Sequence, residues 1–218
     1  MALSFQRRKI ILKDLKGLLE LWRKMYSQGE EEQVVLDFFK DFKGRFLDIG
    51  AADGITYSNT RALYEKGWEG VLVEPSNRLY KELLKLYEGE NRIQIINKVM
   101  GSFTGEIEYF DNEVYTLGST KKEHCELFKN YNPFIKTIAE CLSWDDFINQ
   151  FPGPYHFISI DTEGMDYEIL KLINLKEVDN KMVCVEKVYN NEGIKEYLED
   201  NGYKIIYVSG ENYIGVVK

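Results

Sequence analysis

Residues 46–54 read FLDIGAADG, a short apolar run that passes into a turn bounded by two glycines. The run predicts a buried strand over residues 46–49. Gly50 and Gly54 can adopt the backbone angles of a tight strand-to-helix turn, and without Cβ atoms they allow a ligand to approach closely. A strand, a glycine turn and a helical segment in this order predict the first unit of an α/β fold.

The rest of the chain repeats this alternation. Apolar runs at 70–74, 93–96, 157–160, 182–185 and 204–208 are separated by helical sequence, which predicts parallel strands with right-handed crossovers. The last run, 213–217, follows a turn at 209–212 that leaves no room for a crossover helix. It must therefore pair antiparallel. We predict a doubly wound, Rossmann-like, mostly parallel seven-stranded sheet with a C-terminal antiparallel strand.

Length and composition narrow the class of protein. The 218 residues, 44% apolar and 29% charged, fit one globular α/β domain with a modest extension. No apolar run is long enough to span a membrane. Three widely spaced cysteines and two histidines disfavour a structural zinc site and fit reduced thiols in the cytoplasm. The net charge of −8 disfavours a broad nucleic-acid surface.

The N-terminal part differs from the remainder. Residues 1–26 hold seven basic and two acidic side chains, and apolar residues recur there at helical spacing. A second helix is expected over 30–42, with Val34, Val35, Phe38, Phe39 and Phe42 facing inward. We therefore predict a helical extension over 1–43 and the main domain over 44–218. Residues 5–26 are expected to pack on the domain or on a second copy, or else to contact an anionic membrane surface.

Two acids indicate which cofactor the sheet binds. Glu74 ends the second strand, twenty residues after Gly54, where an acid accepts hydrogen bonds from ribose hydroxyls. The glycine spacing is G-x-x-x-G and not the G-x-G-x-x-G of pyrophosphate-binding loops. Asp48 before the loop would repel a pyrophosphate but suits the cationic methionine end of S-adenosylmethionine. The sequence therefore favours S-adenosylmethionine over a dinucleotide.

Residues 46–54, 58–60 (SNT), 67–75 (GWEGVLVEP) and 158–164 (ISIDTEG) together resemble the FkbM-like methyltransferases of class I. Thr162 stands where Val or Ile is more usual in that family. The resemblance implies methyl transfer from S-adenosylmethionine to an acceptor hydroxyl, often on a sugar or polyketide. It also implies cofactor contacts along two loops and two strand ends, at Asp48, Gly50, Ala51, Asp53, Gly54, Ser58, Glu74, Pro75, Ser76, Asn97 and Val99.

Three further acids follow two other predicted strands. Asp161 and Glu163 come after one strand and Glu186 after another, so all three share one rim of a parallel sheet. We predict Asp161 to be the general base or acceptor-orienting group, and Glu163 and Glu186 to hold acceptor hydroxyls. A divalent cation held by the three acids is the weaker alternative, because no histidine joins them, and no metal is assigned. In the purely structural interpretation Glu163 makes a turn and Glu186 pairs with a lysine.

Residues 106–142 are predicted to form an insertion that covers the substrate. Residues 107–110 are expected to add a strand and 115–120 a loop over the active site. His124 is interpreted as a surface histidine. Five aromatic side chains are expected either to stack on sugar faces or to pack within this lid, and they are Tyr109, Tyr115, Phe128, Tyr131 and Phe134.

The sequence therefore predicts a cytoplasmic S-adenosylmethionine-dependent methyltransferase. Its expected reaction is O-methylation of a sugar, a glycan or another small molecule, with no nucleic-acid partner. One alternative is a nicotinamide-dependent oxidoreductase on the same sheet, disfavoured by the glycine spacing and the terminal hairpin. Another is a cofactor-binding protein without catalytic activity.

Overall fold

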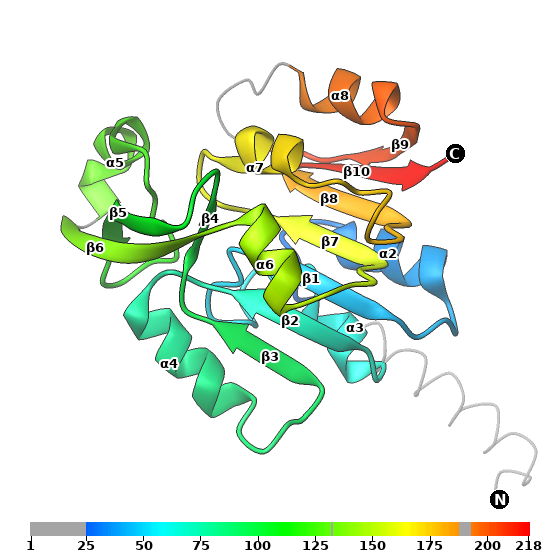
Figure 1. The fold of residues 1–218 in the computed structure, drawn as a ribbon, viewed down its shortest axis with the longest axis horizontal. Coiled ribbons are helices and arrows are strands. Elements are labelled where there is room, and N and C mark those ends of the chain that lie inside the picture. The colour runs from blue at the N-terminus through cyan, green and yellow to red at the C-terminus, as the bar shows by residue number, and fades with distance from the viewer. Residues whose placement is uncertain (1–24, 132, 188–192) are drawn as a thin grey trace, which may run out of the picture.

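The structure is a computed structural model that describes residues 25–131, 133–187 and 193–218. Seven strands form the main sheet, in the order β3-β2-β1-β7-β8-β10-β9 (Figure 1). Their bounds are β1 (Arg45–Ile49), β2 (Glu69–Val73), β3 (Ile93–Ile96), β7 (Phe157–Ile160), β8 (Met182–Glu186), β9 (Tyr203–Val208) and β10 (Asn212–Val217). Only β10 runs antiparallel to its neighbours, between β8 and β9. The predicted seven-stranded, mostly parallel sheet is thereby confirmed.

Helices cover both faces of this sheet. Successive side chains of a strand point to opposite faces, and in the central strands both sets are apolar and have to be buried. Leu47 and Ile49 of β1 pack with α6 (Trp144–Gln150), α7 (Asp166–Leu172) and α8 (Ile194–Asp200). Phe46 of the same strand packs on the other side, with α2 (Glu31–Phe39), α3 (Arg61–Glu65) and α4 (Asn77–Leu86). The central strands are therefore apolar on both faces, which is why their sequences read as continuous apolar runs.

The N-terminal predictions meet the structure only in part. The expected amphipathic helix over 5–26 lies, apart from its last two residues, outside the described residues. Helix α2 is shorter than predicted, since the chain leaves the helical region at Lys40, where φ is 49°. Val35 and Phe39 are buried as expected, but Phe38 and Phe42 are each 41% exposed, so the prediction that both face inward is wrong.

A second, three-stranded sheet is attached beside the carboxyl ends of the central strands (Figure 1). Its strands are β4 (Val99–Gly101), β5 (Gly105–Asn112) and β6 (Phe134–Ser143), and β5 and β6 pair antiparallel over eight residues. Between β5 and β6 lie a loop, helix α5 (Lys122–Leu127) and the short helix η1 (Lys129–Tyr131). The expected added strand at 107–110 is the centre of β5. None of the described helices is long and apolar enough to cross a membrane.

Candidate functional site

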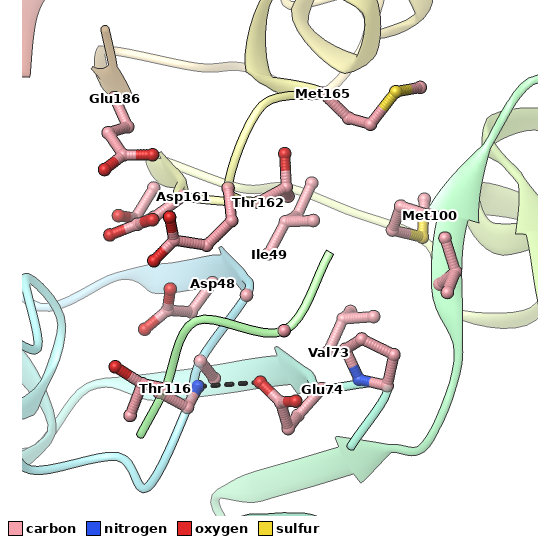
Figure 2. Close-up of a pocket in the computed structure, with 18 of the residues that line it drawn as sticks. Asp48, Ile49, Val73, Glu74, Met100, Thr116, Asp161, Thr162, Met165 and Glu186 are labelled. Atoms are coloured by element: carbon pink, nitrogen blue, oxygen red, sulfur yellow. Dashed lines mark hydrogen bonds between the residues drawn. The ribbon is translucent and has the colours of Figure 1, made fainter. Parts of the chain in front are cut away.

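A cavity opens where β1, β2, β7 and β8 end, and β4 and the loop after β5 form its other side (Figure 2). It encloses about 1060 Å³ of empty space, a volume that includes solvent at its open side. Ten of the residues predicted from the sequence line it. They are Asp48, Gly50, Ala51, Ser58, Glu74, Pro75, Val99, Asp161, Glu163 and Glu186.

Two predicted residues of the glycine loop do not line the cavity. Both carboxylate oxygens of Asp53 are used within the loop, since Oδ1 accepts the backbone N–H of Ile55 (2.8 Å) and Thr56 (2.7 Å) and Oδ2 accepts the Thr56 hydroxyl. Gly54 has a φ of 72°, and a Cβ there would lie 2.7 Å from the Leu83 side chain. These two residues shape the loop and do not face its ligand side.

Ser76 and Asn97, the other two predicted residues that do not line the cavity, support the chain at Glu74. The Ser76 hydroxyl accepts the Leu79 N–H and so caps α4, while its own N–H donates to Glu74. The Asn97 amide donates to the backbone carbonyls of Glu74 (2.8 Å) and Pro75 (3.0 Å). Both residues therefore fix the loop behind the cavity wall.

Gly50 joins the two loops that form the floor of the site. Its φ of 88° is a left-handed conformation, and a Cβ there would lie 1.6 Å from the backbone oxygen of Asp161. Its N–H donates to the Val73 carbonyl at 2.9 Å. The cofactor loop and the loop that carries Asp161 are therefore in backbone contact, and only glycine permits this approach.

Glu74 forms the lower end of the site in Figure 2. The side chain is only 4% exposed. Its Oε2 accepts the Ala52 N–H at 2.9 Å, and its Oε1 accepts the Ser76 N–H at 2.8 Å. Burial raises the pKa of Glu74 to about 8, against the effect of the two N–H donors. Each oxygen can accept a second hydrogen bond, which fits the two hydroxyls of a ribose.

Asp48 lies between Glu74 and the upper acids in Figure 2. Its Oδ2 accepts the Thr60 hydroxyl at 2.6 Å, and burial raises its pKa to about 6. Among the residues that the structure describes, no cationic side chain pairs with this buried carboxylate. It therefore suits a cationic ligand group, as predicted for the methionine end of the cofactor. Together with the space left at Gly50, this arrangement fits S-adenosylmethionine.

Asp161, Glu163 and Glu186 form the upper end of the site. One oxygen of each lies within 4.8 Å of the others, so the structure brings together the three acids that the sequence singled out. Burial raises the pKa of all three, that of Asp161 to about 7. Within the described part of the chain no lysine pairs with Glu186, as the structural interpretation expected one to do, and its Oε2 has no hydrogen-bond partner there.

Asp166, which sequence reasoning missed, organises the loop between β7 and α7. Its carboxylate accepts the N–H (2.6 Å) and the hydroxyl (2.9 Å) of Thr162 and the N–H of Gly164 (3.1 Å). The Thr162 hydroxyl therefore has a structural partner that Val or Ile would lack. Glu163, between them, is held at a φ of 57°, an uncommon conformation for a residue with a side chain. The signal for Asp166 was an acid in the first turn of a predicted helix.

The insertion also contacts Glu163. The Ser119 hydroxyl donates to the Glu163 carbonyl at 2.7 Å, and Nε2 of His124 lies 3.4 Å from Glu163 Oε2. His124 is completely buried, so its interpretation as a surface histidine is wrong. The rings of Phe128 and Phe134 pack on it, and burial lowers its pKa to about 4. Phe128 and Phe134 therefore pack within the insertion.

Other lining residues were not assigned from the sequence. Met100, Met165 and Ile169 give the cavity an apolar wall opposite Asp48, and Gln28 reaches it from the segment before α2. Residues 116–118 and 120 of the predicted loop also line it, together with Tyr109. Methionine and isoleucine side chains carry no local pattern that separates a ligand-binding role from a core role.

Comparisons with known proteins agree with this geometry. A family profile described as the Methyltransferase FkbM domain matches residues 48–205. Among curated proteins the chain is similar to the tRNA-guanine(15) transglycosylase of Methanococcus aeolicus, 27% identical over 167 residues that make up 67% of this chain and 24% of that protein. The chain thus spans about a quarter of the length of that relative.

Solved structures with the same fold are distant in sequence. Monomeric WbdD is 10% identical with a TM-score of 0.51, over 88% of this chain and 41% of that one. The ribosomal protein L11 methylase of Lactobacillus delbrueckii subsp. bulgaricus is 10% identical with a TM-score of 0.50, over 85% and 75%. These two likenesses show the fold alone.

The family match covers most of the chain and includes both loops of the cavity and the strand end at Glu74. The chain therefore belongs to the FkbM methyltransferase family.

Proposed function

We propose that this chain is an S-adenosylmethionine-dependent methyltransferase and that it modifies a hydroxyl group of a carbohydrate or another small-molecule acceptor. The observation that carries the proposal is the cluster of Asp161, Glu163 and Glu186, which line the cavity. Asp161 and Glu186 lie at the end away from Glu74 (Figure 2). Carboxylates are the side chains best suited to accept hydrogen bonds from several hydroxyls at once. The lid beside them leaves a partly enclosed space, as a small acceptor requires.

The bound cofactor supplies a methyl group already activated by its positive sulfur. The protein has to hold the acceptor oxygen in line and take up its proton. Asp161 is suited to the second task, because its pKa of about 7 allows it to receive a proton near neutral pH. Glu163 and Glu186 orient the acceptor through its other hydroxyls.

The cofactor contacts follow from the lower half of the site. Glu74 binds the ribose hydroxyls, and Asp48 and Gly50 face the methionine moiety, with Ala51 and Ser58 beside them. Pro75 and Val99 border the adenine, next to the apolar wall that contains Met100. The support for these assignments is that all of these residues line one continuous cavity.

A nucleic-acid acceptor is the competing possibility, because the name of the curated relative refers to tRNA. This chain overlaps only 24% of that relative, and its net charge of −8 opposes binding to a phosphate backbone. The three cysteines are buried and free, which supports a cytoplasmic location as part of the proposal.

The test is a labelling experiment with S-adenosylmethionine carrying a tritiated methyl group. The purified protein is first titrated calorimetrically with S-adenosylhomocysteine and, separately, with NAD, and micromolar binding of the former alone is expected. It is then incubated with labelled cofactor and panels of oligosaccharides, polyketides, tRNA and protein. Label in a base-stable ether of a sugar or polyketide supports the proposal, whereas label only in tRNA or protein overturns it.

A further inference from the structure

The three carboxylates of the upper end share one small volume. One oxygen each of Asp161, Glu163 and Glu186 lies within 4.8 Å of the other two. Three oxygens spread evenly around a divalent cation that binds oxygen at about 2.1 to 2.6 Å lie roughly 3.6 to 4.5 Å from one another. The observed spacing is at or close to this range, so small side-chain movements bring all three carboxylates onto the same ion.

Glu186 provides a second observation. It is only 9% exposed, and its Oε2 is closed off from solvent and lacks a hydrogen-bond partner among the described residues. Figure 2 shows its carboxylate directed toward Asp161. A buried carboxylate oxygen without a donor is costly to maintain, so its orientation into the cluster points to a ligand that completes it.

The carboxyl groups of Asp161 and Glu186 contact each other, but the other side chains of the described chain do not complete the cluster. Asp166, the next acid, is occupied by Thr162 and Gly164. In the described part of the chain, the one ion-pair contact that involves the three acids is that of Glu163 with His124.

We propose that Asp161, Glu163 and Glu186 bind one divalent cation, and that this ion binds oxygen atoms of the methyl acceptor. A ligand set made only of carboxylate oxygens favours Mg²⁺, Mn²⁺ or Ca²⁺ over zinc and copper. The sequence argued against a metal because no histidine joined the acids, but these hard ions do not require one.

If the proposed function holds, the cation also limits which acceptors fit the site. Three protein oxygens leave about three positions of a six-coordinate ion for water or acceptor. Two adjacent acceptor oxygens can fill two of them, as in a vicinal diol or a hydroxyl beside a carboxylate. The ion would lower the pKa of the hydroxyl that it binds, so that the free oxygen of Asp161, a weaker base once the other oxygen binds the ion, could take up the proton.

The test measures metal binding directly and does not need the acceptor. Protein freed of metal with a chelator is titrated with Mn²⁺ alone, and free Mn²⁺ is followed by electron paramagnetic resonance. One Mn²⁺ per chain is expected, displaced by excess Mg²⁺. Glu186→Gln and Glu163→Gln should each weaken binding at least ~10-fold, because each removes one charged ligand.

Glu168→Gln is the matched control, since it removes the same charge from a side chain on α7 that is 45% exposed and pairs with Lys121. It should bind Mn²⁺ as the parent does. The affinity for S-adenosylhomocysteine, measured on the same samples, checks that each variant is folded.

The proposal is overturned if the parent binds no Mn²⁺ at millimolar concentration, or if both site variants bind it as the parent does. The outcome is separable from that of the proposed function. If Mn²⁺ binds at this cluster but label appears only in tRNA, the proposed carbohydrate or small-molecule acceptor is wrong and the ion site stands. If labelled sugar is formed by a chain that binds no Mn²⁺, the ion site is wrong and the proposed function stands.

Discussion

The two acidic ends of the cavity differ in how the fold completes them. Glu74 and Glu186 are both buried glutamates near a strand end. Both oxygens of Glu74 accept backbone N–H groups, from Ala52 and Ser76, whereas Oε2 of Glu186 has no donor within the described residues. At the proposed cofactor end, around Glu74, the protein itself supplies the hydrogen bonds of the carboxylate. At the proposed acceptor end, around Glu186, a bound ligand has to supply them.

Glu74 and Glu186 differ in this way because their neighbours come from different parts of the chain. The donors to Glu74 belong to the loops directly after β1 and β2, so the same local geometry that forms the turns supplies them. The neighbours of Glu186 are side chains on the loop after β7, and two of them are acids. A fixed cofactor requires a preformed site, and a variable acceptor is better served by groups that its own oxygens or an ion can satisfy.

Gly50→Ala should have the largest effect, because it should disrupt both the cofactor end around Glu74 and the acceptor end around Asp161 and Glu186. The new methyl group would overlap the Asp161 backbone oxygen, and the left-handed φ alone costs about 1–3 kcal/mol. We expect a fall in melting temperature and loss of S-adenosylhomocysteine binding. Gly89→Ala is the control, since its φ is 81° but nothing lies within 4 Å of the added Cβ. A Gly50→Ala variant as stable as Gly89→Ala would contradict the steric argument.

Asp161→Asn should affect only the acceptor end. Asparagine keeps the size of the side chain but cannot take up a proton, so turnover should fall by ~10²–10⁴ while cofactor affinity stays near that of the parent. Single-turnover methylation of an identified acceptor and calorimetric titration with S-adenosylhomocysteine measure the two effects. Full activity in the variant would end the role of Asp161 as base.

Glu74→Ala should affect only the cofactor end. Loss of the carboxylate removes the ribose contact, and the affinity for S-adenosylhomocysteine should fall by ~10–100-fold, or about 1.4–2.7 kcal/mol. Asp53→Asn is the control, because Asp53 does not line the cavity and asparagine can still accept the loop N–H groups. Equal affinities in the two variants would remove the ribose assignment.

The smallest effect expected is on the pH dependence of stability. The pKa of Glu74 is raised to about 8 and that of Asp161 to about 7, above the range of carboxylates in an unfolded chain. Between about pH 4 and pH 8 the folded protein therefore holds protons that the unfolded chain has released. Stability is greatest at the acidic end of this window and is lost as the pH rises.

Scanning calorimetry of the ligand-free protein between pH 5 and pH 8.5 checks this expectation. The melting temperature should fall by at least about 2–4 °C, the equivalent of ~1 kcal/mol for a domain of this size. Glu74→Gln, which does not titrate, should reduce the slope. A melting temperature that rises across this range would show that burial does not keep these acids protonated.

Sequence patterns predicted the main sheet and the residues at its strand ends. Apolar runs and glycine turns are local features, and the position of Glu74 follows from the strand it ends. The direction of each side chain within the turn depends on the folded loop and cannot be read from the motif. Asp53 and Gly54 were therefore expected in the cavity from their positions in the motif, but they do not line it. The roles of Ser119 and His124 depend on contacts with Glu163, about forty residues away, for which no local pattern exists.

The hydrogen bond from Ser119 to the Glu163 carbonyl has a kinetic consequence. It joins the loop after β5 to the acidic loop after β7, and both loops line the cavity. The bond therefore has to break if these loops separate when the cofactor leaves. We expect departure of the spent cofactor, and not methyl transfer, to set the turnover rate. Rapid mixing should then give a burst of about one methylated product per enzyme before the steady phase, and Ser119→Ala should speed that steady phase.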